Sequence, residues 1–321
     1  MKKIVVFGAT GAMGRYIIAN LDKKSWSVRA FTRNENSPLA QALLAHGNLE
    51  LFQGNTDNVD DLKRAIDGVD AVFCNTDFWT NVNNPENERI QMHRILEISK
   101  EKNIAHVVFS SLENCMTLSN GEIPVTHFDS KAIVEQEINW QRSLDHFKQL
   151  KGFYSTSVTV LRTLPYFENL MSFFVPQKRV YKGKDEIVFK LPLGEYGKFS
   201  MVALDDIGWF TNYILNRRSQ YGGKTLVIGS DTVSGNEIAQ KFESVTGIKS
   251  VYEPISDEEF LKLGGPAHDA LNHFKFHREI GMKRNFDSLK KLHPELLSFD
   301  SWLKKTQWKG EQRLIQKKLA E

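Results

Sequence analysis

Little in the sequence points to a secreted, membrane-spanning or nucleic-acid-binding protein. Its two cysteines, Cys74 and Cys115, cannot form a disulfide framework. No segment approaches the roughly 20 apolar residues of a membrane-spanning helix, and the first apolar run ends at a glycine, too short for a signal peptide. The net charge is only +3, and we expect no direct nucleic-acid partner. We therefore expect a reduced, soluble protein of the cytoplasm.

Apolar segments and helical patterns alternate through the first half of the chain. Six segments are rich in β-branched and aromatic residues, as buried parallel strands are: KIVVFG, SVRAFT, LELFQG, DAVFCN, HVVFSS and SVTVLR. Helical patterns lie between them at residues 14–24, 38–46, 60–66, 85–102 and 128 to about 150. This alternation predicts an α/β fold, a Rossmann-type doubly wound parallel sheet.

The second half of the chain is less regular. The segment FSMVALDDIGWFTNYIL reads as a strand followed by a helix, and a strand near residues 224–230 is placed to return to the main sheet. Capping-box spacing predicts helix starts at Ser234 and Ser256. We therefore expect a Rossmann domain over residues 1–164. Residues 165–321 would form a smaller, mostly helical lobe for a substrate or partner, assembled from non-contiguous pieces.

A glycine-rich loop follows the first predicted strand directly. In GATGAMG the glycines Gly8, Gly11 and Gly14 are spaced as G-x-x-G-x-x-G, between a strand and a helix. Such glycines allow a tight turn and a close backbone approach to a pyrophosphate, and the helix N-terminus supplies amide donors. The alternative is a glycine-rich turn without a ligand. The context favours a dinucleotide site.

The end of the second predicted strand indicates which dinucleotide binds. Proteins of this kind that prefer NAD place an acidic residue there, against the ribose hydroxyl. This chain has VRAFTRNENS, with no acid before Glu35, and Arg33 is placed to meet a 2′-phosphate. The alternative role for Arg33 is a solvated loop side chain. We expect NADP(H) as the cofactor.

His127 and Lys131 lie four residues apart in THFDSK, at the start of a predicted helix. Residues at this spacing share one helix face, so both side chains should point into the same space. Histidine titrates near neutrality and is a competent general acid, and a lysine can also serve in a desolvated pocket. The two are therefore candidate catalytic residues.

Two further patterns have simpler interpretations. His273 and His277 stand at helical spacing, as metal ligands can, but no third ligand is in sight. We expect them to pack or to form hydrogen bonds, and we expect no metal site. The basic C-terminal tail, SWLKKTQWKGEQRLIQKKLAE, is by default a solvated terminal helix, with a membrane-surface or partner helix as the alternative.

Five motifs together resemble those of the NmrA-like family, atypical members of the short-chain dehydrogenase/reductase superfamily. They are GATGAMG, TRN, SSLEN, HFDSK and LPYFENL, and the similarity extends into LGGPAHD in the second half. The resemblance covers nearly the whole chain. It implies an NADP(H)-binding Rossmann fold.

The resemblance also implies a role for individual residues. The pyrophosphate would be held by Gly8, Thr10, Gly11, Ala12, Met13 and Gly14, and the 2′-phosphate by Arg33. Adenine would lie beside Asn55 and Thr56, and the path to the nicotinamide beside Thr76, Asp77 and Phe78. Lys131 would bond the nicotinamide ribose, and the nicotinamide end would be closed by Tyr166, Phe167, Glu168 and Asn169.

Two departures bear on the function. Active short-chain dehydrogenases carry Tyr-x-x-x-Lys where this chain has His127 and Lys131, and the NmrA-like family shares the loss of the tyrosine. The family also often has a lysine where this chain has Ile90. The resemblance therefore implies a regulatory NADPH/NADP+ sensor that acts through a protein partner, in the cytoplasm and also the nucleus, and compatible with a homodimer. The alternative is an NADPH-dependent reductase of quinones or other conjugated carbonyls.

Overall fold

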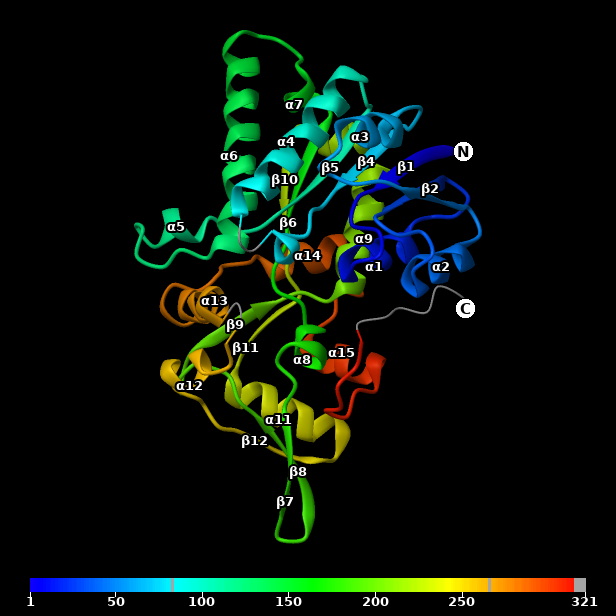
Figure 1. The fold of residues 1–321 in the computed structure, drawn as a ribbon. Coiled ribbons are helices and arrows are strands. Elements are labelled where there is room, and N and C mark those ends of the chain that lie inside the picture. The colour runs from blue at the N-terminus through cyan, green and yellow to red at the C-terminus, as the bar shows by residue number, and fades with distance from the viewer. Residues whose placement is uncertain (82–83, 265–266, 315–321) are drawn as a thin grey trace.

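The computed structural model describes residues 1–81, 84–264 and 267–314, and a parallel sheet forms its centre (Figure 1). The sheet has seven strands in the order β10-β6-β5-β4-β1-β2-β3, and each neighbouring pair runs parallel. Its strands are β1 (Lys2–Val6), β2 (Trp26–Thr32), β3 (Leu49–Gln53), β4 (Ala71–Cys74), β5 (His106–Ser111), β6 (Val158–Arg162) and β10 (Thr225–Val227). The expected doubly wound parallel sheet is confirmed.

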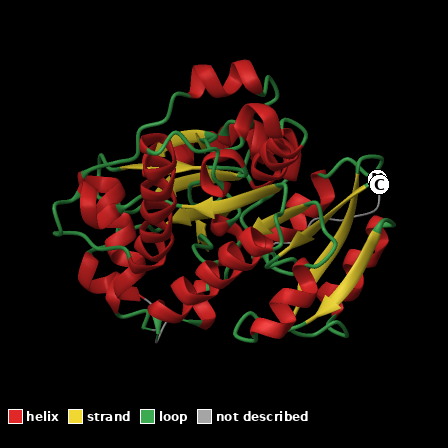
Figure 2. Cartoon of the chain, turned by 90° about the horizontal axis from the view of Figure 1, so that it is seen from above, coloured by secondary structure: helices red, strands yellow, loops and turns green. Residues whose placement is uncertain are grey.

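Helices cover both faces of this sheet (Figure 2). Successive strand residues point to opposite faces, so Ile4 and Val6 belong to one buried cluster and Val5 and Phe7 to another. The first face is covered mainly by α1 (Ala12–Asn20), α2 (Pro38–Leu43), α9 (Leu204–Leu215) and α14 (Phe286–Leu292). The second is covered by α3 (Val59–Ile66), α4 (Pro85–Glu101), α6 (Thr126–Phe147) and α7 (Phe153–Thr156).

The end of α6 projects beyond the sheet, in the stretch of residues 139–155 (Figure 1). Arg142 anchors this stretch: its Nη2 donates to the Val158 carbonyl at 2.8 Å, and its Nη1 donates to Thr225 Oγ1 at 3.1 Å. Trp140 and Phe147 remain exposed at 64% and 84%. The arginine thus ties the projecting helix to the edge strand β10, and its contact with Val158 ties it to the neighbouring strand β6.

Part of the second half of the chain packs around a hydrophobic cluster of its own, separate from those that flank the main sheet. We call this part the second lobe, and it contains two small sheets beside its helices. One holds β7 (Gln177–Tyr181), β8 (Lys184–Phe189) and β12 (Lys249–Tyr252), and the other holds β9 (Lys198–Met201) and β11 (Asp231–Ser234). The hairpin between β7 and β8 turns at Lys182 and Gly183, which both have positive φ. This is the backbone that a two-residue hairpin requires. Of these five strands, only β9 was predicted, as the strand at the start of FSMVALDDIGWFTNYIL.

Helices and the C-terminal segment complete the core of the second lobe. The helices are α8 (Asn169–Ser172), α11 (Gly235–Thr246), α12 (Asp257–Leu261), α13 (Ala267–Glu279) and α15 (Phe299–Thr306). Trp302 and Trp308 are fully buried there. The described part of the tail is therefore not a solvated helix, because its tryptophans fill the core; residues 315–321 lie outside the described residues.

Short helices and turns join these elements. They are η1 (Leu44–His46), η2 (Phe78–Thr80), α5 (Cys115–Leu118) and α10 (Arg218–Tyr221). Among the residues that the structure describes, none of the helices is both long and apolar enough to span a membrane.

Candidate functional site

The loop between β1 and α1 has the backbone of a phosphate-binding turn. Gly8 has φ +71°, and a Cβ on Gly14 would lie 2.2 Å from the Gly8 carbonyl oxygen. Gly11 is the N-cap of α1 and offers no side chain to cap it. Because the first N–H groups of a helix have no acceptor within the helix, they favour an anion. The loop therefore fits a pyrophosphate.

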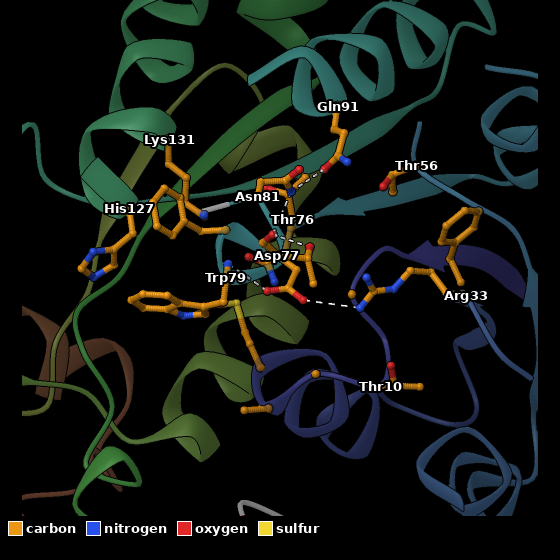
Figure 3. Close-up of a pocket in the computed structure, with 18 of the residues that line it drawn as sticks. Thr10, Arg33, Thr56, Thr76, Asp77, Trp79, Asn81, Gln91, His127 and Lys131 are labelled. Atoms are coloured by element: carbon orange, nitrogen blue, oxygen red, sulfur yellow. Dashed lines mark hydrogen bonds and ion pairs between the residues drawn. The ribbon is translucent and has the colours of Figure 1, made fainter. Parts of the chain in front are cut away.

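A cleft of about 630 Å³ opens above this loop, where strands β1 to β4 end (Figure 3). Ligands bind at this edge in open α/β sheets. Most of the predicted site residues line it: Gly8, Thr10, Gly11, Ala12, Met13, Arg33, Asn55, Thr56, Thr76, Asp77, Phe78, His127, Lys131, Tyr166 and Asn169. The structure thus brings together residues from loops far apart in the sequence.

Arg33 lies at the end of β2 and faces a carboxylate across the cleft (Figure 3). Its Nη2 is 3.5 Å from Asp77 Oδ2, and both side chains are at least half exposed. The same Asp77 accepts a hydrogen bond at 3.2 Å from the backbone N–H of Trp79, in η2. The guanidinium is accessible to an anionic ligand, and Asp77 connects it to the η2 turn.

Side chains that hydrogen-bond to the loops around the cleft form its polar wall. Gln91 Nε2 donates to Asp57 Oδ1 at 2.7 Å, and Asn81 Nδ2 donates to the Asp77 carbonyl at 2.9 Å. Gln91 belongs to α4, whereas Asp57 follows β3. These contacts fix the loops after β3 and β4 against α4.

Lys131 is held by a buried carboxylate from α4. Its ammonium forms a buried ion pair with Glu88, which is fully buried. Glu88 also accepts hydrogen bonds from Ser130 and, at 2.8 Å, from Thr76 Oγ1. A buried charge without such partners would be very costly. The pair fixes the position of Lys131 and satisfies its charge within the first lobe.

His127, one turn earlier on α6, is held from the second lobe instead. Its Nδ1 contacts the carboxylate of Asp269 on α13. The His127 ring lies 5.2 Å from that of Trp79 and 4.7 Å from that of Phe128, between centroids. Figure 3 shows His127 and Trp79 on one side of the cleft. The contact with Asp269 joins the two lobes beside the cleft.

An apolar cavity of about 310 Å³ adjoins the cleft at this end. His127, Tyr166 and Trp79 are among the residues that line both spaces. The remaining walls are mainly apolar, and they include Phe128, Leu164, Pro165, Phe174, Phe260, Leu263, Ala267 and Ala270. Such a cavity suits a flat, hydrophobic molecule with few polar groups.

Three residues predicted to contact the cofactor do not line the cleft. Gly14 lies behind the loop, where its missing side chain lets α1 approach Gly8. Phe167 is fully buried and packs against Phe299 and Trp302 in the second lobe. Both therefore have structural roles: Gly14 allows the close approach of α1, and Phe167 fills the core of the second lobe.

Glu168 is the third, and it is a buried structural acid. It accepts hydrogen bonds from Trp302 Nε1 at 2.9 Å and from the Leu204 N–H at 3.2 Å. Burial raises the pKa of Glu168 to about 7. The side chain thus joins α9 to α15 rather than closing over a ligand.

Several lining residues were not predicted. They are Phe31, Thr32, Asp57, Asn75, Trp79, Thr80, Asn81, Gln91, Leu112 and Phe173. Ile90, at the position where a family lysine is common, is 38% exposed and does not line the cleft. Glu88 and Gln91 are instead polar residues on the buried face of α4. Their i,i+3 spacing puts them on one helix face, and this is the sequence pattern from which their role could have been predicted.

His273 and His277 have the packing role that the sequence suggested. The Phe199 ring lies 5.6 Å from His273 and 4.8 Å from His277, between centroids. Burial lowers the pKa of His277 to about 3 and that of His273 well below its ordinary value. Both rings are therefore neutral members of the lobe interface.

Comparison with known proteins supports one family assignment. The model of the NmrA-like family matches residues 1–303. An NmrA-like family domain-containing protein of Dictyostelium discoideum is 22% identical over 315 residues, covering 96% of this chain and 99% of its own. The NmrA-like family domain-containing oxidoreductase FrzB of Cladobotryum sp is 27% identical over 270 residues, covering 78% and 76%.

Two groups of solved structures share the fold. NmrA, a negative transcriptional regulator crystallised with NADP, superposes with a TM-score of 0.72 at 20% identity, over 94% of each chain. The triphenylmethane reductase of Citrobacter sp., crystallised with NADP(H), gives 0.71 at 19% identity, over 94% of this chain and 99% of its own. One is a regulator and the other an enzyme, so the shared fold does not choose between these functions.

Proposed function

Because the chain belongs to the NmrA-like family, we propose that it binds NADP(H) and reduces a hydrophobic, conjugated electrophile such as a quinone. The observation that carries the proposal is the apolar cavity beside the cofactor cleft, with His127 and Tyr166 lining both. An apolar acceptor in this cavity would lie next to the cleft that fits the cofactor and next to His127. Bound NADPH would supply the hydride.

The residues of the cleft fit this cofactor. The N-terminus of α1 offers backbone amides to the pyrophosphate, and Arg33 offers a partly exposed guanidinium to the 2′-phosphate. Lys131 lies in the cleft with its charge balanced by Glu88, so it is positioned to donate to a neutral ribose hydroxyl. Similar proteins named as an oxidoreductase and a reductase add support.

The proton required for reduction would come from His127. Lys131 is already paired with Glu88, whereas the hydrogen bond of His127 to Asp269 uses Nδ1, and no described residue hydrogen-bonds its Nε2. Burial also raises the pKa of Tyr166, which makes its phenol a weaker acid. Among these three side chains, the imidazole is best suited to pass a proton at neutral pH.

The test is NADPH consumption with a panel of quinones, enones and aldehydes. We expect catalytic loss of the reduced nicotinamide absorbance with hydrophobic acceptors. Turnover should be inhibited by an apolar compound that fills the second cavity without competing with NADPH. Tight NADPH binding without oxidation by any acceptor would refute the reductase function.

A second candidate, the redox-sensing regulator, is favoured by one contact. Asp77 pairs with Arg33 and also caps the η2 turn, which carries Trp79 toward His127. A cofactor phosphate at Arg33 would compete with Asp77 and so loosen this turn. Because NADPH and NADP+ carry the same phosphate, a difference between them would have to arise at the nicotinamide, on the Trp79 side of the turn. Sensing requires that the two protein arrangements bind NADPH and NADP+ with different affinities.

Hydrogen exchange separates the sensor from a simple cofactor-binding protein. We expect amide protection in residues 76–81 to differ between the NADPH and NADP+ complexes if the η2 turn reports the redox state. Equal protection in both complexes would remove the sensor candidate. A protein partner would then have no nucleotide-dependent surface at this turn to recognise.

A further inference from the structure

His127 and Asp269 form a dyad that spans the two lobes. Asp269 accepts from the Thr126 N–H at 2.5 Å and contacts His127 Nδ1, so it meets both the backbone and the ring at the start of α6. The two side chains are only 15% and 13% exposed. Because water has little access to this contact, the two hydrogen bonds of Asp269 hold the His127 ring in one orientation.

The charge of Asp269 determines which of the two ring nitrogens of His127 carries the proton. Burial alone would raise its pKa, but hydrogen bonds from His127 and Thr126 outweigh burial and hold the pKa of Asp269 below its ordinary value. An ionised carboxylate can only accept hydrogen bonds. Nδ1 of His127 must therefore carry a proton, which leaves Nε2 as the ring nitrogen that can serve a ligand.

We propose that Asp269 is the positioning residue for proton delivery: it holds one proton of His127 on Nδ1 and orients the ring, so that Nε2 can take up a second proton and pass it to the reduced substrate. This inference rests on the reductase function proposed above. The dyad has the same logic as an aspartate that orients a catalytic histidine in a hydrolase triad. Here the carboxylate comes from α13, so the donor is complete only when the second lobe is in place.

The reaction balances with the groups present. A quinone takes a hydride from NADPH and a proton from Nε2 of His127 in its imidazolium form, in which both ring nitrogens carry a proton; the Nε2–H bond breaks, and an O–H bond forms on the quinone oxygen. The products are a hydroquinone, NADP+ and a neutral imidazole, which regains its proton from solvent. A cationic triphenylmethane dye differs, because hydride alone converts it to the neutral leuco form and no proton is needed.

The first measurement needs no acceptor. In ¹⁵N-labelled protein, the nitrogen shifts of the neutral His127 ring report its tautomer, and we expect Nδ1–H in the wild type. In Asp269→Asn, the amide oxygen would keep the Thr126 N–H, and the amide NH₂ would face Nδ1. The ring should then switch to Nε2–H, and an unchanged Nδ1–H tautomer would overturn the proposal.

The second measurement compares two acceptors. We expect Asp269→Asn to lower kcat for a naphthoquinone by about 100-fold, the usual size of a general-acid contribution, and to change dye reduction by less than about twofold, because no proton is transferred there. The matched control is Asn272→Ala, which removes another α13 contact, Asn272 Nδ2 to the Pro124 carbonyl at 2.9 Å. It should leave both rates unchanged.

The outcomes separate the two claims. Equal losses with quinone and dye would mean that Asp269 only supports the fold, which would overturn the positioning role. If the wild type reduces neither acceptor, the reductase function fails and proton delivery fails with it, whatever the tautomer. A tautomer switch together with a quinone-specific loss would establish both claims.

Discussion

The cofactor cleft and the apolar cavity share a wall but are built differently. The cleft is lined mainly by loops that follow neighbouring strands of one sheet, and the charged side chains of Arg33 and Asp77 are partly exposed there. The cavity needs α6 of the first lobe and α12 and α13 of the second, and it is mainly apolar. One lobe forms the nucleotide end, whereas both lobes form the reacting end.

The two side chains at the boundary show the same contrast. Lys131 is anchored by Glu88 within its own lobe, and His127 is anchored by Asp269, which is 142 residues away in the sequence. The lysine should therefore keep its position if the lobes separate, but the histidine should not. We therefore expect that loosening the contact between the lobes would disturb the position of His127 more than the position of Lys131, and so proton transfer more than cofactor binding.

The largest expected effect comes from breaking the anchor inside the first lobe. Glu88→Ala leaves Lys131 as an unpaired buried cation, which typically costs about 3–5 kcal/mol. Denaturant unfolding should show this loss in the free energy of unfolding. Glu101→Ala, at the exposed end of the same helix, is the control and should change stability little. Equal losses in both variants would contradict a special role for the Glu88–Lys131 pair.

The pH dependence of stability probes the second lobe. Burial raises the pKa of Glu168 from an ordinary value of 4.5 to about 7. The folded protein therefore holds a proton that the unfolded chain has lost, and the resulting stability, present below pH 4.5, disappears as pH rises through 7. The contribution is at most about 3 kcal/mol.

Glu168→Gln should remove this dependence of the free energy of unfolding on pH. We expect the wild type to lose stability relative to the variant between about pH 4.5 and 7, measured by urea unfolding at a series of pH values. Because Glu168 does not line the cleft, NADPH affinity should change little. A parallel pH profile in both proteins would show that Glu168 titrates normally.

Arg33→Ala sharpens the description of the nucleotide end. Loss of a charge-assisted contact to the 2′-phosphate should weaken NADPH binding by about tenfold or more. NADH has no such phosphate, so its affinity should stay nearly constant. Calorimetric titration of both nucleotides checks this, and an unchanged NADPH affinity would place the phosphate elsewhere.

Asp77→Asn should have the smallest effect, and it should raise the affinity for NADPH rather than lower it. Removing the carboxylate 3.5 Å from Arg33 frees the guanidinium and removes a repulsion from the phosphate. Exposed ion pairs contribute little, so we expect NADPH affinity to rise by about threefold. The asparagine can still accept from the Trp79 N–H. Weaker NADPH binding in this variant would show that Asp77 supports the site rather than competing with the cofactor.

The sequence predicted the strand–loop–helix geometry after β1 because its signals are local. A strand, three glycines and a helix in direct succession determine the loop geometry, and Arg33 follows from the end of β2. The reacting end was only half predicted. His127 and Lys131 were identified by their spacing, but their carboxylate partners, Asp269 and Glu88, were not.

Long-range pairing explains what the sequence could not provide. Nothing near Asp269 marks it as a partner of a residue on α6, and only the packing of α13 against the first lobe creates the contact. Phe167 and Glu168 were assigned to the site because the family resemblance implied that the whole segment from Tyr166 to Asn169 closes over the nicotinamide end. Their side chains face the second-lobe core instead, which depends on the backbone course after β6.

The central claim is that hydride leaves NADPH in the cleft and reaches an acceptor in the apolar cavity. We would supply NADPH deuterated at one or the other face of the nicotinamide C4 and a carbon acceptor, a cationic triphenylmethane dye or a conjugated enone. The account predicts deuterium in the product carbon from only one of the two labelled cofactors. Label from both cofactors equally, or no labelled product with any acceptor, would contradict it.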